Sequence, residues 1–121
     1  MEIHRSSSAQ WRTITHFGSR GVALMPVMRI EGRGQVVRLA LEPGGVIGRH
    51  RAGTAQVLLV LTGTGWVGGE DGERHLVAPG DRVVWSPGEE HETATDGGMT
   101  ALVVECESLE VGSATVFDPE T

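Results

Sequence analysis

The chain has 121 residues, of which 18 are glycine, and its 16 acidic side chains outnumber its 10 basic ones, all arginine, for a net charge of −6. This length fits one domain, and the acidic balance argues against a surface that binds nucleic acid or an anionic membrane. The absence of lysine and tyrosine excludes Schiff-base chemistry and catalysis by a phenol.

Short valine-rich runs recur along the chain, separated by glycine, proline and acidic residues, whereas helical periodicity is nearly absent. In chain order, we expect strands over residues 21–30, 35–41, 56–62, 65–67, 75–77, 82–85 and 99–105. Glycine-rich and Asp-Gly turns between such runs are typical of antiparallel hairpins. About seven or more short strands predict an all-β sandwich or small barrel.

The whole chain, residues 1–121, is expected to form a single domain. Its core should span about 35–105, preceded by one or more strands within 11–30. The polar tail, 111–121, is either a last edge strand or loose chain. Residues 1–10 lack the apolar core of a signal peptide, and one cysteine permits no intramolecular disulfide, so we expect a cytoplasmic protein, with bacterial origin suggested by the arginine bias.

Two spaced histidine motifs lie within the expected core. The first is Gly44, five residues, then His50, Ala52, Gln56, six residues and Gly63; the second is Gly80, five residues, then Ser86-Pro87-Gly88, two residues and His91. In this order and spacing, over residues 35–104, they resemble the motifs of the cupin family. The resemblance implies a small jelly-roll-like β-barrel (a double-stranded β-helix of the RmlC-like type), usually a homodimer, often holding a metal inside.

Matched residue by residue, the resemblance implies a depleted site. The family's metal is often held by three histidines and one glutamate. His50 and His91 match the first and third of these histidines, whereas Ala52 replaces the second histidine and Gln56 the glutamate. One reading is a weak site for one divalent ion (Fe, Mn, Ni, Cu or Zn) held by His50, Gln56 and His91, which supply no negative charge. The other is a metal-free pocket in which both histidines act as hydrogen-bonding or acid–base groups. A regular strand over 49–56 would place His50, Ala52 and Gln56 on one face.

Three other side chains are candidate substrate contacts. Arg38 lies within an apolar strand and could bind a carboxylate or phosphate from inside, or pair with a carboxylate at the rim. Trp66 and Trp85 could form an apolar pocket wall, or could be ordinary core or interface residues.

Several residues near the motifs have weaker claims. The acidic neighbours Glu89, Glu90 and Glu92 form a solvated turn, or one of them orients His91 or supplies the missing negative charge of the metal site. His75 is a remote candidate for a further metal ligand. Cys106 lies between two glutamates, which disfavours a reactive thiolate.

Function therefore has three readings. The first is an enzyme of isomerase, dioxygenase or lyase type, metal-assisted or not, in which His50 and His91 act on a polar small molecule. In this reading Gln56 orients the substrate and Arg38 holds its anionic group. The second is a non-catalytic, metal-free module that binds or senses a small ligand. The third is a purely structural homodimer. A fold alone does not choose among them.

Overall fold

The structure is a computed structural model that describes residues 1–7 and 10–111, so the predicted tail lies outside the described residues except for Val111. These residues form strands and a 3-10 turn at His16–Gly18, with no α-helix among them, as the all-β prediction requires. No helix in the described part of the chain is long and apolar enough to cross a membrane. The strands are β1 (Glu2–His4), β2 (Arg12–Ile14), β3 (Val22–Leu24), β4 (Met28–Leu41), β5 (Val46–Arg51), β6 (Ala55–Gly63), β7 (Gly65–Gly68), β8 (Arg74–Val77), β9 (Arg82–Trp85), β10 (Glu90–Ala94) and β11 (Met99–Val111).

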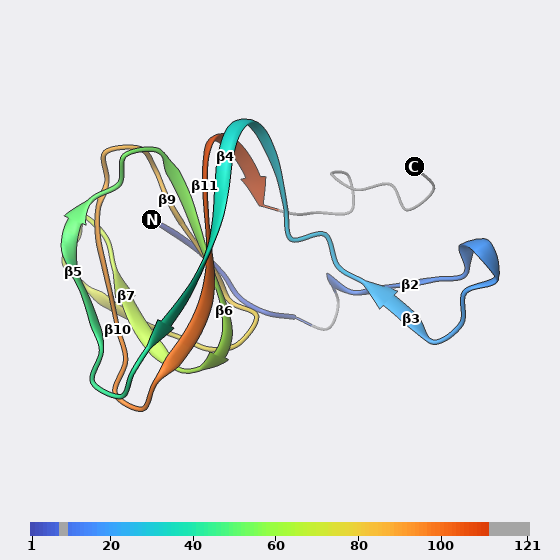
Figure 1. Cartoon of the computed structure of the whole chain (residues 1–121), viewed down its shortest axis with the longest axis horizontal. Helices are drawn as coiled ribbons and strands as arrows, with labels where there is room; N and C mark the ends of the chain where they lie inside the picture. Colours follow the sequence, from blue (N-terminus) through green and yellow to red (C-terminus); the bar gives the residue numbers. More distant parts are fainter. Residues whose placement is uncertain (8–9, 112–121) are drawn as a thin grey trace.

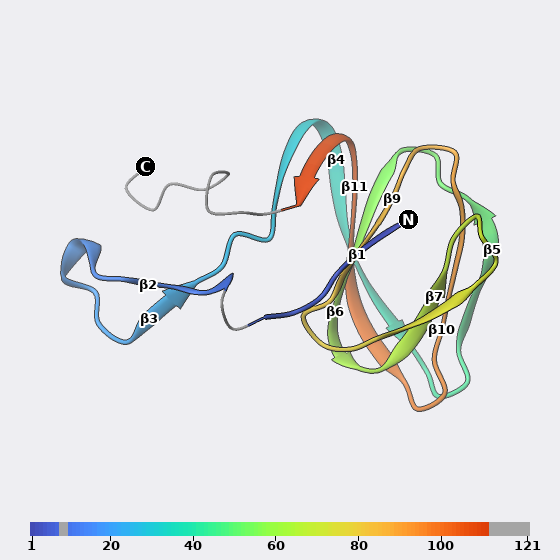
Figure 2. The ribbon, with the colours of Figure 1, turned by 180° about the vertical axis from the view of Figure 1, so that it is seen from behind.

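Two antiparallel sheets form a barrel (Figure 1). One has the strand order β1-β9-β6-β11-β4 and the other β5-β10-β7-β8. The β2–β3 hairpin forms a separate pair and stands away from the barrel, as the view from behind also shows (Figure 2). Its tip exposes Phe17 almost completely, at 90%.

The core lies between the two sheets, where alternate residues of the strands point inward. Trp85 is its largest member, at 1% exposure, and it packs among aliphatic side chains from β6, β7, β8, β9 and β11. The buried cluster consists of Leu58, Val60, Val67, Val77, Val83, Trp85, Met99, Ala101 and Val103.

The longest strand differs from the sequence prediction. The glycine-rich segment at 31–34 was expected to be a turn, but β4 runs through it and pairs with β11 along its length. Gly34 makes this close pairing possible, because a Cβ there would lie 2.8 Å from the carbonyl oxygen of Glu105. The expected strand over 21–30 is also divided, because β3 ends before Pro26 and β4 begins after it.

The Asp81 side chain connects the N-terminal segment to the turn that precedes β9 through hydrogen bonds. Its carboxylate accepts hydrogen bonds from the backbone N–H groups of Ser6 and Ala78, each at 2.9 Å, and from Arg5 Nη1 at 3.0 Å. Burial alone would raise the pKa of Asp81, but these bonds outweigh it and hold the pKa below its ordinary value. The carboxylate form is therefore the one that stabilises the fold.

We expect Asp81→Ala to lower the free energy of unfolding by about 1–3 kcal/mol, because the part-buried hydrogen bonds from two backbone N–H groups lose their acceptor. The contribution should be complete above about pH 4 and should be lost as the pH falls through the lower folded-state pKa of Asp81. Urea unfolding at several pH values measures both effects. Asp96→Ala, at an exposed turn, is the matched control; equal losses in the two variants would contradict this role of Asp81.

Candidate functional site

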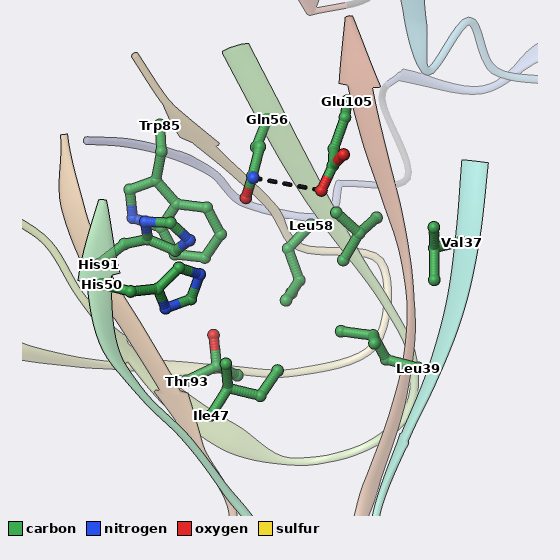
Figure 3. A pocket seen from close by; sticks show the side chains of 11 residues that line it. Val37, Leu39, Ile47, His50, Gln56, Leu58, Trp85, His91, Thr93 and Glu105 are labelled. Carbon is green, nitrogen blue, oxygen red and sulfur yellow. Dashed lines mark hydrogen bonds between the residues drawn. The ribbon is translucent and has the colours of Figure 1, made fainter. Parts of the chain in front are cut away.

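A cavity of about 190 Å³ opens between the two sheets (Figure 3). Its wall is mostly aliphatic, and its polar groups come from β5, β6, β10 and β11. A volume below the usual range for drug-sized ligands favours a small molecule. The lining residues are Val37, Leu39, Ile47, His50, Gln56, Leu58, Trp85, His91, Thr93, Val103 and Glu105.

The two motif histidines lie side by side in this cavity. Strands β5 and β10 pair antiparallel with His50 opposite His91, and the ring centroids are 4.2 Å apart. The Trp85 ring packs against the His91 ring, and their centroids are 4.6 Å apart. His91 is buried at 4% exposure, whereas His50 is exposed. The strands expected from valine runs did not include β5 or β10, which lack such runs, and the strand considered over 49–56 overlaps β5 only at residues 49–51.

Backbone carbonyls set the orientation of both imidazoles. Nδ1 of His50 donates to the carbonyl of Gly48 at 2.7 Å, and Nδ1 of His91 donates to the carbonyl of Glu89 at 3.2 Å. A carbonyl can only accept, so the neutral form of each ring carries its proton on Nδ1 and leaves Nε2 as a lone-pair acceptor. Each Nε2 is thus available to accept a proton.

Burial lowers the pKa of His91, and the charges of His50 and Arg49 act in the same direction, against the opposing effects of Glu89. We expect the His91 ring to titrate below its ordinary pKa of about 6.5 in an NMR pH titration, with His91→Asn identifying the resonance. Because His91 binds a proton more readily in the unfolded chain than in the folded protein, protonation favours unfolding. The contribution of neutral His91 to the free energy of unfolding should be complete above about pH 6.5 and should fall at lower pH. A midpoint at or above about 6.5 would contradict the burial argument.

Glu105 is a cavity residue that the sequence interpretation missed. It projects inward from β11, and its Oε1 accepts a hydrogen bond from Gln56 Nε2 at 3.3 Å (Figure 3). Its Oε2 accepts a second one from Gln35 Nε2 at 2.8 Å. The signal was present in the alternation of β11, since Ala101, Val103 and Glu105 share one face. The cavity therefore contains a carboxylate that the motif comparison did not include.

The other predicted substrate contacts lie in different places. Arg38 is exposed, on the face of β4 opposite to Val37 and Leu39, and this placement does not support contact with a ligand in the cavity. Trp85 lines the cavity and also belongs to the core. Trp66 does not line it, and its ring lies 3.5 Å from the guanidinium carbon of Arg74.

The carboxylates of Glu89 and Glu90, beside His91 in the sequence, form ion pairs with other groups. Glu89 binds the Met1 ammonium group at 2.7 Å, and its backbone carbonyl, not its carboxylate, contacts the His91 ring. Glu90 pairs with Arg49 at 3.0 Å. On β11, burial raises the pKa of the Cys106 thiol, which agrees with the expectation of an unreactive cysteine.

Of the three predicted metal ligands, His50 and His91 lie side by side, whereas Gln56 lies on the opposite sheet. The strand over 49–56 is not regular, as β5 ends at Arg51 and β6 begins at Ala55, so Gln56 reaches the cavity from the opposite sheet. Ala52 is buried at 3% exposure and provides no ligand atom. Within the described ranges, His50, His91 and Glu105 do not bring three ligand atoms within 4.8 Å of one another. This donor set does not fit a resident ion with three protein ligands, and we derive no step through a metal.

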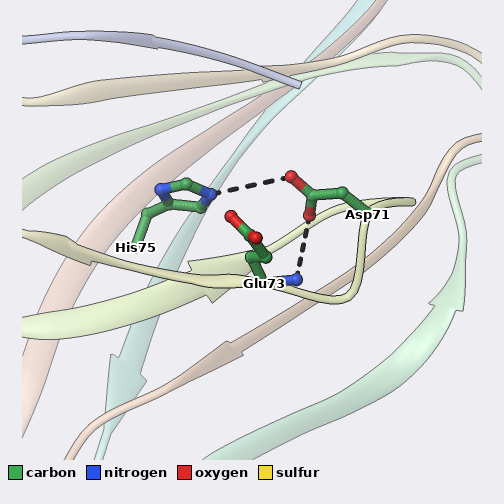
Figure 4. Close-up of side chains that lie close together, drawn as sticks. All are labelled: Asp71, Glu73 and His75. Atoms are coloured by element: carbon green, nitrogen blue, oxygen red, sulfur yellow. Dashed lines mark hydrogen bonds and ion pairs between the residues drawn. The ribbon is translucent and has the colours of Figure 1, made fainter.

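One cluster within the described ranges does meet that distance criterion, namely Asp71, Glu73 and His75 (Figure 4). It lies at the turn between β7 and β8, where Asp71 Oδ1 accepts from the backbone N–H of Glu73 at 3.0 Å and Oδ2 lies 3.8 Å from His75 Nε2. His75 is not among the cavity-lining residues, so this geometry does not make it a further ligand beside His50 and His91.

Residues 37–106 match the family described as the cupin domain. The chain is 36% identical over 69 residues to an (R)-mandelonitrile lyase from Granulicella tundricola, which covers 55% of this chain and 53% of that protein, so the chain spans about half of this curated relative.

Solved structures show the same fold. A cupin 2 conserved barrel domain protein from Salinispora arenicola superposes with a TM-score of 0.57 at 24% identity, covering 89% of this chain and 90% of that one. A protein described as a predicted oxalate decarboxylase from Thermotoga maritima gives a TM-score of 0.56 at 24% identity, covering 60% of this chain and 65% of that one. At these identities the likeness concerns the fold alone.

Proposed function

The chain belongs to the cupin family, and from this premise we propose that its barrel cavity binds a small molecule with which His50 and His91 exchange a proton. The observation that carries the proposal is the pair of imidazoles, 4.2 Å apart, in the wall of a largely aliphatic cavity. Each Nδ1 is engaged by a backbone carbonyl, which leaves Nε2 to act on the ligand. Burial keeps the pKa of His91 low, so this ring is a proton acceptor at neutral pH.

We propose a lyase-type reaction, in which a carbon–carbon bond next to a hydroxyl group is broken. This class is favoured over isomerase and dioxygenase chemistry because the curated relative is named a mandelonitrile lyase. The substrate is a cyanohydrin such as mandelonitrile, in which one carbon carries both the hydroxyl group and the nitrile group. An imidazole Nε2 takes the hydroxyl proton, and the oxygen forms a carbonyl with its carbon. The bond to the nitrile carbon breaks, and its electron pair leaves with the nitrile carbon. Return of the proton to that carbon gives hydrogen cyanide and an aldehyde. Leu58 and Val103 provide an apolar wall for the ring of such a substrate.

The test is the formation of benzaldehyde from (R)-mandelonitrile, followed by absorbance at pH 7 against a buffer blank. We expect a rate above the blank that is proportional to protein concentration. An unchanged rate, together with saturable binding of the nitrile, would overturn the lyase assignment and favour the non-catalytic binding module. That alternative has one observation behind it, since Ala52 replaces a residue that metal-binding relatives would use.

A further inference from the structure

Glu105 gives the cavity a charge that neither the motifs nor the relatives assign a use. Building on the proposed binding function, we propose that Glu105 selects ligands that carry a cationic or hydrogen-bond-donating group and excludes anionic ones. Among the described residues that line the cavity, Glu105 is the acidic side chain and none is an arginine. This reverses the expectation of an anionic substrate held by Arg38.

The carboxylate is held in place but not neutralised. Its two oxygens accept from the side-chain amides of Gln56 and Gln35, at 3.3 and 2.8 Å, and amides carry no charge. A carboxylate offers about four lone-pair sites, so these two bonds leave acceptor capacity for a ligand. Glu105 is half-buried and lines both the cavity and a shallower groove, so its carboxylate is not sealed within the core.

No cation within the described residues forms an ion pair with Glu105. Arg33 borders the same shallow groove, but it makes no contact with the carboxylate within 4.0 Å. The two histidines belong to the opposite sheet, across the cavity from Glu105 (Figure 3). Burial lowers the pKa of His91, so that ring adds no compensating charge at neutral pH.

Charge then decides which ligands are admitted. An anion would lose water and approach a carboxylate in a largely apolar space, where repulsion is weakly screened. An ammonium group would instead form a charge-assisted hydrogen bond to a free Glu105 lone pair. A neutral alcohol can donate to the same oxygen and should rank between them. The hydroxyl compound of the proposed lyase reaction is compatible with this order.

Three probes of one shape test the inference: benzylamine, benzyl alcohol and benzoate. Their dissociation constants are measured by calorimetry or NMR at pH 7 for the wild type, Glu105→Gln and Glu107→Gln. We expect the wild type to bind benzylamine at least tenfold more tightly than benzoate, a difference that one charge-assisted hydrogen bond supplies. Glu105→Gln should erase this preference. Glu107→Gln removes the same charge from an exposed neighbour and should retain it.

The outcomes separate the two proposals. Benzoate binding as tightly as benzylamine in the wild type would overturn the charge selection but leave the cavity as a binding site. If Glu105→Gln and Glu107→Gln reduce the preference for benzylamine equally, the preference comes from overall charge, and the charge selection by Glu105 is overturned. If benzyl alcohol and the other probes all fail to bind at millimolar concentration, the proposed binding function fails, and the inference fails with it. The ranking in the wild type needs no variant, so a folding defect in Glu105→Gln cannot hide the result.

Discussion

Trp85→Ala is expected to lower the free energy of unfolding by about 3–5 kcal/mol, the usual cost of truncating a fully buried aromatic residue. Trp85 is 1% exposed within the buried cluster, and its indole N–H donates to the carbonyl of Gly68 at 3.3 Å. Its ring also packs against His91, with centroids 4.6 Å apart. The substitution therefore removes core volume, a bridge between the two sheets and the support of a site residue. Urea unfolding followed by circular dichroism measures the loss.

Trp66→Ala is the control of the same residue type. Trp66 is only partly buried and packs beneath Arg74 on the outside of the barrel, so we expect a loss near 1 kcal/mol, as for an exposed cation–π contact. Similar losses of unfolding free energy in the two variants would contradict the larger contribution to stability that we assign to Trp85. The sequence left open whether each tryptophan is a core or a pocket residue. For Trp85 both descriptions hold.

The all-β fold could be predicted because its strongest signals are local. Glycine-rich turns and valine runs mark β6, β9 and β11 whatever their neighbours are. The strands β5 and β10 lack that signal, because they are exposed or polar over much of their length and owe their conformation to pairing with each other. The motif spacing identified both histidines, but only the register between these two strands shows that the rings meet.

The inner and outer faces of the large sheet could not be assigned from the sequence. Val36, Val57, Val84 and Val104 form a cross-strand row on the outer face, so both faces of these strands are apolar. Without a polar side to mark the solvent, alternation gives two equivalent choices. One of these choices places the Arg38 side chain inside the barrel, and Glu105 was not among the candidate site residues. Their positions follow from which face packs against the second sheet.

His50→Ala and His91→Ala are each expected to reduce kcat/KM for (R)-mandelonitrile by about 10²–10⁴-fold, the usual contribution of a general base, with little loss of folded structure. His75→Ala is the matched control, because His75 lies in an exposed hairpin outside the cavity lining and should leave the rate unchanged. Circular dichroism distinguishes lost activity from lost fold. Unfolding of both cavity variants would assign the histidines a structural role, and an unchanged rate would remove them from the mechanism.

The double variant then asks whether the two imidazoles act together. Their rings are 4.2 Å apart and the two residues are directly opposed across β5 and β10, so a proton taken by one Nε2 lies beside the other ring. Residues that act as one unit show strongly non-additive losses, because removing either one already abolishes the shared step. We therefore expect the double His50→Ala, His91→Ala variant to lose about as much activity as the more impaired single variant. Losses that multiply would instead show that each histidine contacts the substrate independently.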